Sequence, residues 1–203
     1  MPQLLQVPNQ PILLPTCDKG GLKNTLSVSP ERVIESRRIY DGRIVHLRVD
    51  TVSLSNQRTA LREIVNTPGA VAIVPLTADG QVRLVRQYRS AVADYLLELP
   101  AGTLQPGEAP EAAAPRELAE ETGDRAEHWR YLTRFHTMPG VCDETIHLYL
   151  ATGLTQGATN RDPDEDIEVV TLPLARALEM SRSGEIRDAK TIVGLFLAAQ
   201  VVG

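Results

Sequence analysis

Three glutamates on one predicted helix are the side chains of this 203-residue sequence best suited to chemistry. Glu117, Glu120 and Glu121 lie in the stretch GTLQPGEAPEAAAPRELAEETGD, and a helix that advances about 100° per residue places them within one arc of roughly 100°. Like charges at this spacing destabilise a helix by ~0.2–0.5 kcal/mol in water, and their repulsion grows inside a protein. Such a face needs cations. Arg116, four residues before Glu120, supplies one, and a hard divalent ion such as Mg²⁺, which prefers oxygen ligands and substrate phosphates, would supply more.

The same stretch follows the pattern G-x5-E-x7-R-E-L-x-E-E-x-G. This is the pattern of the Nudix box, and the segment resembles that family of hydrolases. The resemblance implies a loop–helix–loop that binds Mg²⁺ or Mn²⁺, with Glu120 and Arg116 as catalytic residues. The residues matching box positions are the metal ligands Glu117, Glu120, Glu121 and the Ala101 carbonyl, the bracing pair Arg116 and Glu108, and the loop glycines Gly102 and Gly123.

Two residues depart from the box pattern. Asp124 stands where the box normally ends in an aliphatic residue, so the apolar contact that often seals a helix end is expected to be missing. Pro115 precedes Arg116. If the helix begins near Pro110, where proline suits the first turn, Pro115 removes a backbone hydrogen bond and costs about 3 kcal/mol. We therefore expect a kink or a late helix start at Pro115, with the glutamate face preserved beyond it.

The segments around the box narrow the resemblance. REIVNTPGAVAIVPL, LVRQYR, LLELPAG, TMPGVCDETIHLYLAT and IEVVTLPLARALEMSRSGEIRDAKT are similar to the ADP-ribose pyrophosphatase branch, and together they span most of residues 40–195. The resemblance implies metal-dependent hydrolysis of ADP-ribose to AMP and ribose 5-phosphate. Gln105 differs from the glutamate found in many relatives.

The resemblance also implies roles outside the box. Glu144 matches the glutamate of a mobile Pro-Gly loop and is expected to be the general base, with Asp143 as its rival. Arg89 matches an arginine that contacts substrate phosphates, a role that suits the forked guanidinium. Glu98 is expected to contact substrate as well. Arg62 and Glu63 match positions that reach the substrate from the partner subunit of a homodimer whose N-terminal strands are exchanged.

The wider pattern predicts an α+β fold, an α/β/α layered Nudix fold with a mixed sheet between helices. We expect a proline-rich arm at 1–30, a strand region for dimerisation at 31–66, and the hydrolase domain at 67–203. In the strand that starts at Arg43, Val45, Leu47 and Val49 alternate with polar residues. Further strands are expected at 60–65, 70–76, 81–89, 95–99, 130–135, 146–152 and 167–172, an acidic loop at 160–166, and closing helices at 174–182 and 188–201.

Composition and charge exclude several classes of function. The net charge is −5, and no lysine- or arginine-rich block is present, which argues against a nucleic-acid or membrane surface. The N-terminus lacks the basic start of a signal peptide, and no apolar run is long enough for a membrane span. Cys17 and Cys142 are expected to be free thiols in a reducing cytoplasm.

Three further residues are given structural rather than catalytic places. Trp129 is expected in the core or at an interface. Asp188 is expected near a helix N-cap, and Lys190 at the start of the same helix.

Two other functions stay open at this point. One is hydrolysis of nucleotide sugars such as GDP-mannose or UDP-glucose, because selectivity depends on pocket contacts that one sequence does not resolve. The other is a module that binds ADP-ribose or a related nucleotide without cleaving it. The intact box glutamates argue against the second.

Overall fold

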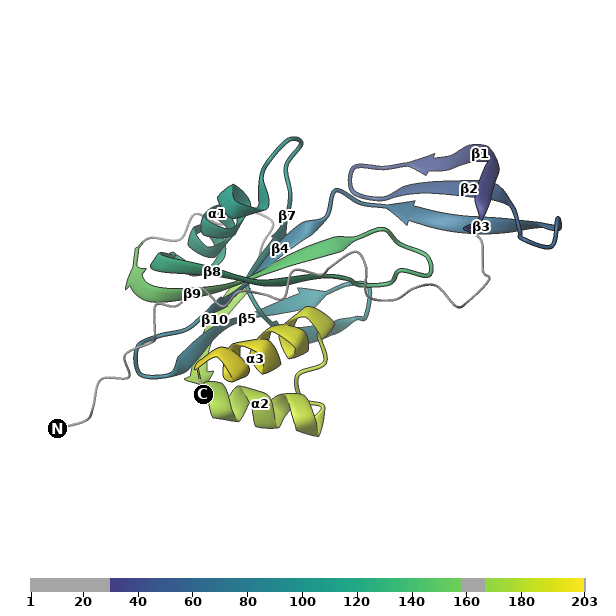
Figure 1. The fold of residues 1–203 in the computed structure, drawn as a ribbon. Coiled ribbons are helices and arrows are strands. Elements are labelled where there is room, and N and C mark those ends of the chain that lie inside the picture. Colours follow the sequence, from purple (N-terminus) through teal and green to yellow (C-terminus); the bar gives the residue numbers. More distant parts are fainter. Residues whose placement is uncertain (1–29, 158–166, 203) are drawn as a thin grey trace, which may run out of the picture.

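The computed structural model describes residues 30–157 and 167–202 of the chain. These residues form three β-sheets with helices, and one small sheet projects from the body (Figure 1). The arm expected at 1–30 falls outside the described residues except for residue 30, and the acidic loop expected at 160–166 falls outside them entirely. Within the described segments, every helix is too short or too polar to cross a bilayer.

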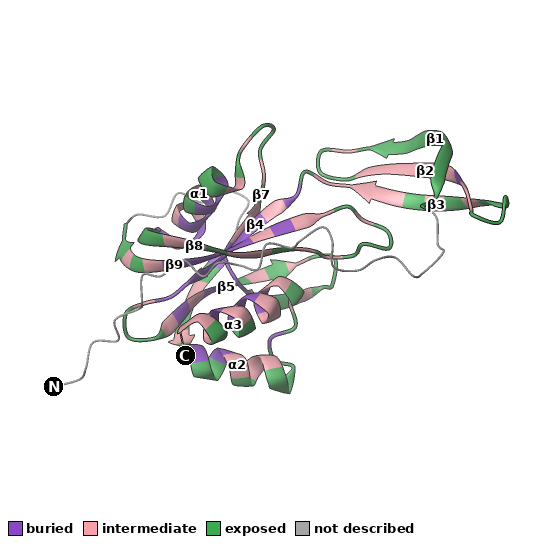
Figure 2. Cartoon of the chain, viewed as in Figure 1, coloured by how far each residue is buried: buried purple, intermediate pink, exposed green. Residues whose placement is uncertain are grey.

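The projecting sheet is formed by β1 (Arg32–Asp41), β2 (His46–Ser53) and β3 (Thr59–Asn66), which pair antiparallel in that order. Every residue of β1 is exposed (Figure 2). A three-stranded sheet needs an apolar face to be buried if it is to be stable. This sheet therefore has little core of its own in the single chain.

The buried residues of β2 are not those expected from its alternation. Val45 precedes the strand and is 42% exposed, while Leu47 and Val49 are only half-buried. The residues that are buried, Asp50 and Val52, lie on the opposite face. Alternation predicts which face of a strand is apolar, but the depth of burial depends on what covers that face.

The larger sheet of the body has the strand order β7-β4-β9-β8. Its strands are β4 (Ala70–Pro75), β7 (Ala101–Thr103), β8 (Asp124–His136) and β9 (Thr145–Gln156). β4 and β9 pair in parallel, and the other neighbours pair antiparallel. The mixed sheet therefore places β7, the strand that leads into the glutamate helix, beside the most buried strand.

The apolar run of β4 is continuous because both of its faces are covered. Val71 and Ile73 pack with Leu118 of α1 (Pro110–Thr122). The alternate residues of β4 belong to a second core cluster that includes the C-terminal helix. The strand is thus the central partition between two apolar cores, and it fixes α1 against one of them.

The second body sheet, in the order β10-β5-β6, carries the remaining helices. Its strands are β5 (Gln81–Arg89), β6 (Asp94–Glu98) and β10 (Ile167–Pro173), and the helices are α2 (Leu174–Ser183) and α3 (Ala189–Val202). Figure 1 shows α1 on one side of the sheets and α2 with α3 on the other. The expected α+β fold with sheets between helices is confirmed.

Several expected boundaries are wrong. The glutamate helix does not start late: it begins at Pro110 and is continuous through Pro115. Pro115 is exposed, so the backbone hydrogen bond that it removes is on the solvent side of the helix rather than in the core. β8 begins at Asp124, not near Arg130. β1 and β7 have no individual counterpart among the expected strands, since an exposed edge and a three-residue strand leave little periodicity to detect.

Candidate functional site

Arg116 organises the carboxylates of α1. Its Nε and Nη2 atoms donate to the two oxygens of Glu108 at 2.8 and 2.8 Å, and its Nη1 donates to Glu117 at 2.7 Å and to Glu120 at 2.9 Å. Hydrogen bonds from Arg116 and from the Gln105 backbone lower the pKa of Glu108 to about 2. The same carboxylates raise the pKa of Arg116. One guanidinium thus pairs with three acidic groups and holds them close together.

The loop before α1 fits closely over the glutamates. Gly102 lies so near Glu117 that a side chain at position 102 would overlap the carboxylate. The backbone N–H of Ala101 donates to Glu121 at 3.1 Å. Glu117 and Glu121 are buried, with exposed fractions of 8% and 4%. Strand β7 and helix α1 therefore form a single acidic site, as the box pattern predicts.

The C-terminal end of α1 differs from the box pattern at Asp124. Gly123 caps the helix in the left-handed conformation with φ 75°, and its N–H donates to the Ala119 carbonyl at 3.0 Å. Asp124 is fully buried and accepts a hydrogen bond of 2.7 Å from Arg83 of β5. Burial raises the pKa of Asp124, and the charge of Arg83 opposes that rise. An ion pair, not an apolar contact, therefore seals this helix end.

The donor set suits a hard divalent cation. Glu117 and Glu120 accept hydrogen bonds from the same Nη1 atom of Arg116, so their oxygens lie side by side, and Glu121 is on the same helix face. In the described residues, no three acidic, histidine or cysteine side chains already converge on one point as metal ligands. Glu117 and Glu120 are both paired with Arg116. Carboxylate oxygens without sulfur or imidazole are the ligands that Mg²⁺ and Mn²⁺ prefer.

A second charged network borders the first. Arg89 donates through Nε and Nη2 to the two oxygens of Glu98 at 2.7 and 2.7 Å, and Lys190 also contacts Glu98. Burial acts to raise the pKa of Glu98, but the two cations outweigh it and hold that pKa below its ordinary value. The hydrogen bonds that Arg89 donates to Glu98, together with the negative charges of Glu98 and nearby Glu121, raise the pKa of Arg89. The Arg89 side chain remains 41% exposed, so it faces both the buried pair and the solvent.

Helix α3 fastens this network in place. Asp188 accepts hydrogen bonds from the Thr191 backbone N–H at 2.9 Å and hydroxyl at 2.6 Å, which confirms the expected N-cap. The Thr191 hydroxyl oxygen in turn accepts from the Leu99 N–H at 2.8 Å. Lys190 is in the first turn, as expected, and it also reaches Glu98. The sequence shows no signal for that long-range contact.

The loop between β8 and β9 carries Glu144. One carboxylate oxygen of Glu144 accepts a hydrogen bond of 2.8 Å from the Thr137 hydroxyl. Asp143 is engaged differently: its carboxylate accepts from the Asn66 side chain at 2.5 Å and from the Thr67 N–H at 3.0 Å. Burial acts to raise the pKa of Asp143, but these two hydrogen bonds, its own backbone N–H and the charge of Arg48 together outweigh burial and lower that pKa. The two rival acids therefore have different surroundings, one of them fixed to the end of β3.

Within the single chain, two residues expected to bind substrate lie apart from the acidic site on α1. Arg62 and Glu63 belong to β3 of the projecting sheet, apart from α1 (Figure 1). Arg62 is paired with Glu31 of the same chain. Trp129 packs beside the α1 core in an edge contact with Tyr149, as expected for a core residue.

Comparison with known proteins agrees with this geometry. The NUDIX domain family matches residues 66–192, and the family described as nucleoside diphosphate sugar hydrolase N-terminal domain matches residues 31–65. The methanol dehydrogenase activator of Bacillus methanolicus is 42% identical over 167 residues, which cover 81% of this chain and 90% of that protein. The ADP-ribose pyrophosphatase of Bacillus subtilis is 41% identical over 163 residues, which cover 79% and 88%.

Two further similarities concern substrate and fold. A GDP-mannose pyrophosphatase of Salmonella arizonae is 39% identical over 137 residues, which cover 62% of this chain and 70% of that protein. The crystal structure of an ADP compounds hydrolase superposes with a TM-score of 0.79 at 25% sequence identity, covering 87% of this chain and 96% of that one. The matches extend over both the projecting sheet and the body.

Proposed function

This chain belongs to the Nudix family of hydrolases, and from that premise we propose that it cleaves ADP-ribose with one water to AMP and ribose 5-phosphate. The observation that carries the proposal is the acidic face of α1: Glu117 and Glu120 are paired with Arg116, and Glu121 accepts a hydrogen bond from the Ala101 N–H, next to Gly102. The similarity to the ADP-ribose pyrophosphatase of Bacillus subtilis, which covers 79% of this chain, supports the choice of substrate.

We assign the metal site to Glu117, Glu120, Glu121 and the Ala101 carbonyl, with Mg²⁺ or Mn²⁺ as the ion. When bound, such an ion neutralises diphosphate oxygens and lowers the pKa of a water. Arg116 orients two of these carboxylates, and Glu108 holds Arg116 by a bidentate pair. The chain itself thus supplies the carboxylate oxygens for the ion, and Arg116 holds two of these groups side by side.

Arg89 is the proposed phosphate contact. Its pair with Glu98 uses Nε and Nη2, which leaves the Nη1 amino group for a substrate oxygen. Glu98, which Lys190 also contacts, holds the guanidinium in one orientation, so less entropy is lost when a phosphate binds. Glu98 therefore acts on substrate mainly through Arg89.

Glu144 is the proposed general base. Asp143, its neighbour, already accepts two hydrogen bonds from residues at the end of β3, whereas the Glu144 carboxylate accepts one from the Thr137 hydroxyl. A base must reach a water near the scissile bond, and a hydroxyl partner is exchanged more easily than two amide donors. This difference supports Glu144 over Asp143.

We infer that the chain works as a homodimer through its projecting sheet, with Arg62 and Glu63 reaching the partner's substrate. The sheet exposes large apolar side chains that a partner would cover: Val33, Ile34, Ile39, Tyr40 and Leu61 are 46–66% exposed. We also infer that the protein acts in the cytoplasm, where Cys142 would remain a free thiol.

A nucleotide-sugar pyrophosphatase is the second candidate. The similarity to a protein named GDP-mannose pyrophosphatase favours it, although that similarity covers less of the chain. The box chemistry is the same for both substrates, since the broken bond is a diphosphate in each case. The contacts that distinguish a ribose from a mannose lie outside the box.

A substrate panel distinguishes these functions. ADP-ribose, GDP-mannose and UDP-glucose are incubated with the protein and Mg²⁺ or Mn²⁺, and the products are identified by chromatography. We expect the highest kcat/KM for ADP-ribose, with AMP and ribose 5-phosphate as products. A higher kcat/KM for a sugar nucleotide would replace the first candidate with the second, and binding without turnover would indicate a sensor module.

A further inference from the structure

The projecting sheet and the Glu144 loop are joined at one point. The Val65 N–H donates to the Val141 carbonyl at 2.8 Å, and the Asp143 N–H donates to the Val65 carbonyl at 3.2 Å. Residues 65 and 142 thereby form a parallel bridge. These hydrogen bonds join the end of β3 to residues 141–143 of the body, directly before Glu144.

The carboxylate of Asp143 strengthens this junction. It accepts one hydrogen bond from the Asn66 Nδ2 at 2.5 Å and one from the Thr67 N–H at 3.0 Å. Hydrogen bonds to a charged acceptor are stronger than those between neutral groups. The last residue of β3 and the residue after it therefore hold the loop one peptide unit away from Glu144.

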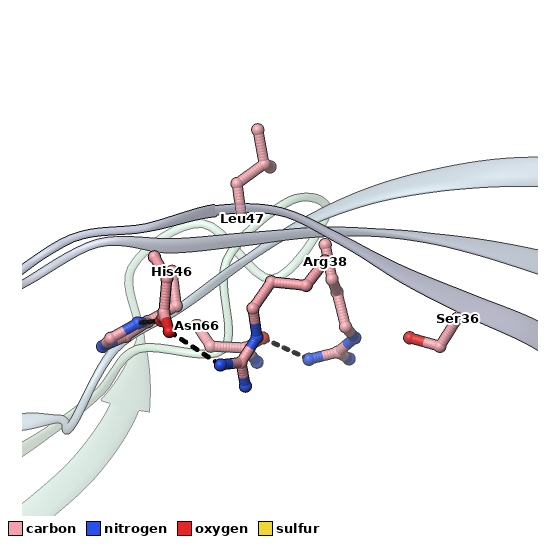
Figure 3. A pocket seen from close by; sticks show the side chains of 7 residues that line it. Ser36, Arg38, His46, Leu47 and Asn66 are labelled. Carbon is pink, nitrogen blue, oxygen red and sulfur yellow. Dashed lines mark hydrogen bonds and ion pairs between the residues drawn. The ribbon is translucent and has the colours of Figure 1, made fainter.

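Arg48 fixes which way the Asn66 amide faces. Its Nη1 contacts the Asn66 Oδ1, so the amide nitrogen is the end directed at Asp143. Arg48 is itself held by Asp50, which is 2% exposed, through a hydrogen bond of 3.0 Å. Figure 3 shows Asn66 close to Arg38 and His46, which line with it a pocket of about 700 Å³ on the projecting sheet. The chain of contacts runs from the buried Asp50 across β2 and β3 to the loop.

We propose that Asn66 and Asp143 are positioning residues for Glu144, so that the projecting sheet sets the place of the base. This inference rests on the proposed function. The Thr137 hydroxyl holds the Glu144 carboxylate itself, and the Asn66–Asp143 contact holds the backbone beside it. A base misplaced by about 1 Å can lose on the order of 100-fold in rate. The sheet would thus contribute to catalysis in its own subunit as well as to dimerisation.

The test combines single and double variants with ADP-ribose and Mg²⁺. Glu144→Gln should lower kcat by about 10²–10⁴-fold, the range typical of a lost general base. Asn66→Ala should lower kcat by about tenfold, a fraction of that loss, and leave KM within about twofold. In the Glu144→Gln background, Asn66→Ala should have no further effect on kcat, since the group that it positions is already removed.

A matched control and a second variant complete the design. Arg38→Ala removes an exposed pair with Asp41 on the same face of the sheet and should leave kcat unchanged. Asp143→Asn keeps an oxygen for the Thr67 N–H but loses the charge, so it should lower kcat less than Asn66→Ala. Circular dichroism and light scattering verify that each variant is folded and has the oligomeric state of the parent.

The outcomes separate this inference from the function on which it rests. If Glu144→Gln leaves kcat unchanged, the assignment of the base itself fails. If Glu144→Gln is inactive but Asn66→Ala and Asp143→Asn are as active as the parent, only the positioning role fails. An equal loss of kcat from Asn66→Ala in the parent and in the Glu144→Gln background would also overturn the positioning role, because that result indicates general structural damage.

Discussion

The carboxylate of Glu117 lies directly against the Cα of Gly102. A Cβ atom at position 102 would be 1.9 Å from Glu117 Cδ, and real Cβ contacts are essentially never shorter than 3.0 Å. The backbone of β7 thus approaches α1 more closely than any residue with a side chain permits. This contact explains physically why a glycine precedes the helix by this distance in the sequence.

Gly102→Ala should therefore abolish activity while the fold is retained. The added methyl group displaces the Glu117 carboxylate and with it the contact to Arg116. We expect kcat to fall by about 100-fold or more, comparable to a 1 Å misplacement of a catalytic group. Thr103→Ala, an exposed change on the same strand, serves as the control and should retain kcat. An active Gly102→Ala enzyme would contradict the close approach of strand and helix.

Glu121→Gln should separate an enzyme from a sensor. Removing one carboxylate charge weakens a site for a hard cation, so ADP-ribose turnover should fall by about 100-fold or more while the fold persists. Calorimetry should show weaker Mg²⁺ binding than in the parent. Chelation of the parent with EDTA should stop turnover, and added Mg²⁺ or Mn²⁺ should restore it. The exposed Glu127 provides a control, since Glu127→Gln should change neither turnover nor Mg²⁺ binding.

Removing one partner of the Arg83–Asp124 pair should destabilise the fold, whereas replacing both partners by apolar residues should not. Asp124→Leu leaves Arg83 without its carboxylate in a mostly buried site and should destabilise the fold by about 3 kcal/mol, as for other buried pairs that lose one partner. The double change Arg83→Met with Asp124→Leu should recover most of that loss. Urea unfolding measures both. A double variant no more stable than Asp124→Leu would mean that the pair is required for the fold itself.

Stability should fall with pH in the range where Glu108 titrates. The pKa of Glu108 is lowered from 4.5 to about 2 by Arg116 in the folded state. The unfolded chain therefore binds this proton more readily, so the stabilisation is complete above about pH 4.5 and is lost as the pH falls toward 2. Glu108→Gln should weaken the pH dependence of the urea midpoint between pH 5 and 3. Identical slopes for parent and variant would show that Glu108 is not held in this way.

The projecting sheet should determine the oligomeric state of the protein in solution. Light scattering should give twice the chain mass of 22.2 kDa. Leu61→Asp places a charge on the exposed apolar face of β3 and should shift the protein toward monomer. Val92→Asp, an equally exposed apolar position in a turn of the body, should leave the dimer intact. A monomeric parent protein at micromolar concentration would rule out the dimer.

Much of the glutamate site could be predicted because its geometry is local. Arg116 and Glu120 are four residues apart, and one turn of helix brings them together whatever the rest of the fold does. The buried run of β4 and the N-cap at Asp188 follow from equally short patterns. Pro115 illustrates the limit: local rules predict a disturbance, but its exposure and the packing of α1 on β4 keep the helix continuous from Pro110.

The sequence by itself determined the acidic character of the proposed site, because it places carboxylates at helical spacing next to a bracing arginine. Only the tertiary structure decided the pairs that join distant segments: Arg83 with Asp124, Asn66 with Asp143, and Lys190 with Glu98, separated by 41, 77 and 92 residues. Such pairs depend on strand register and on how the sheets pack, which no short pattern of residues encodes. For that reason the sequence predicts which groups do the chemistry, and the fold determines what holds them in place.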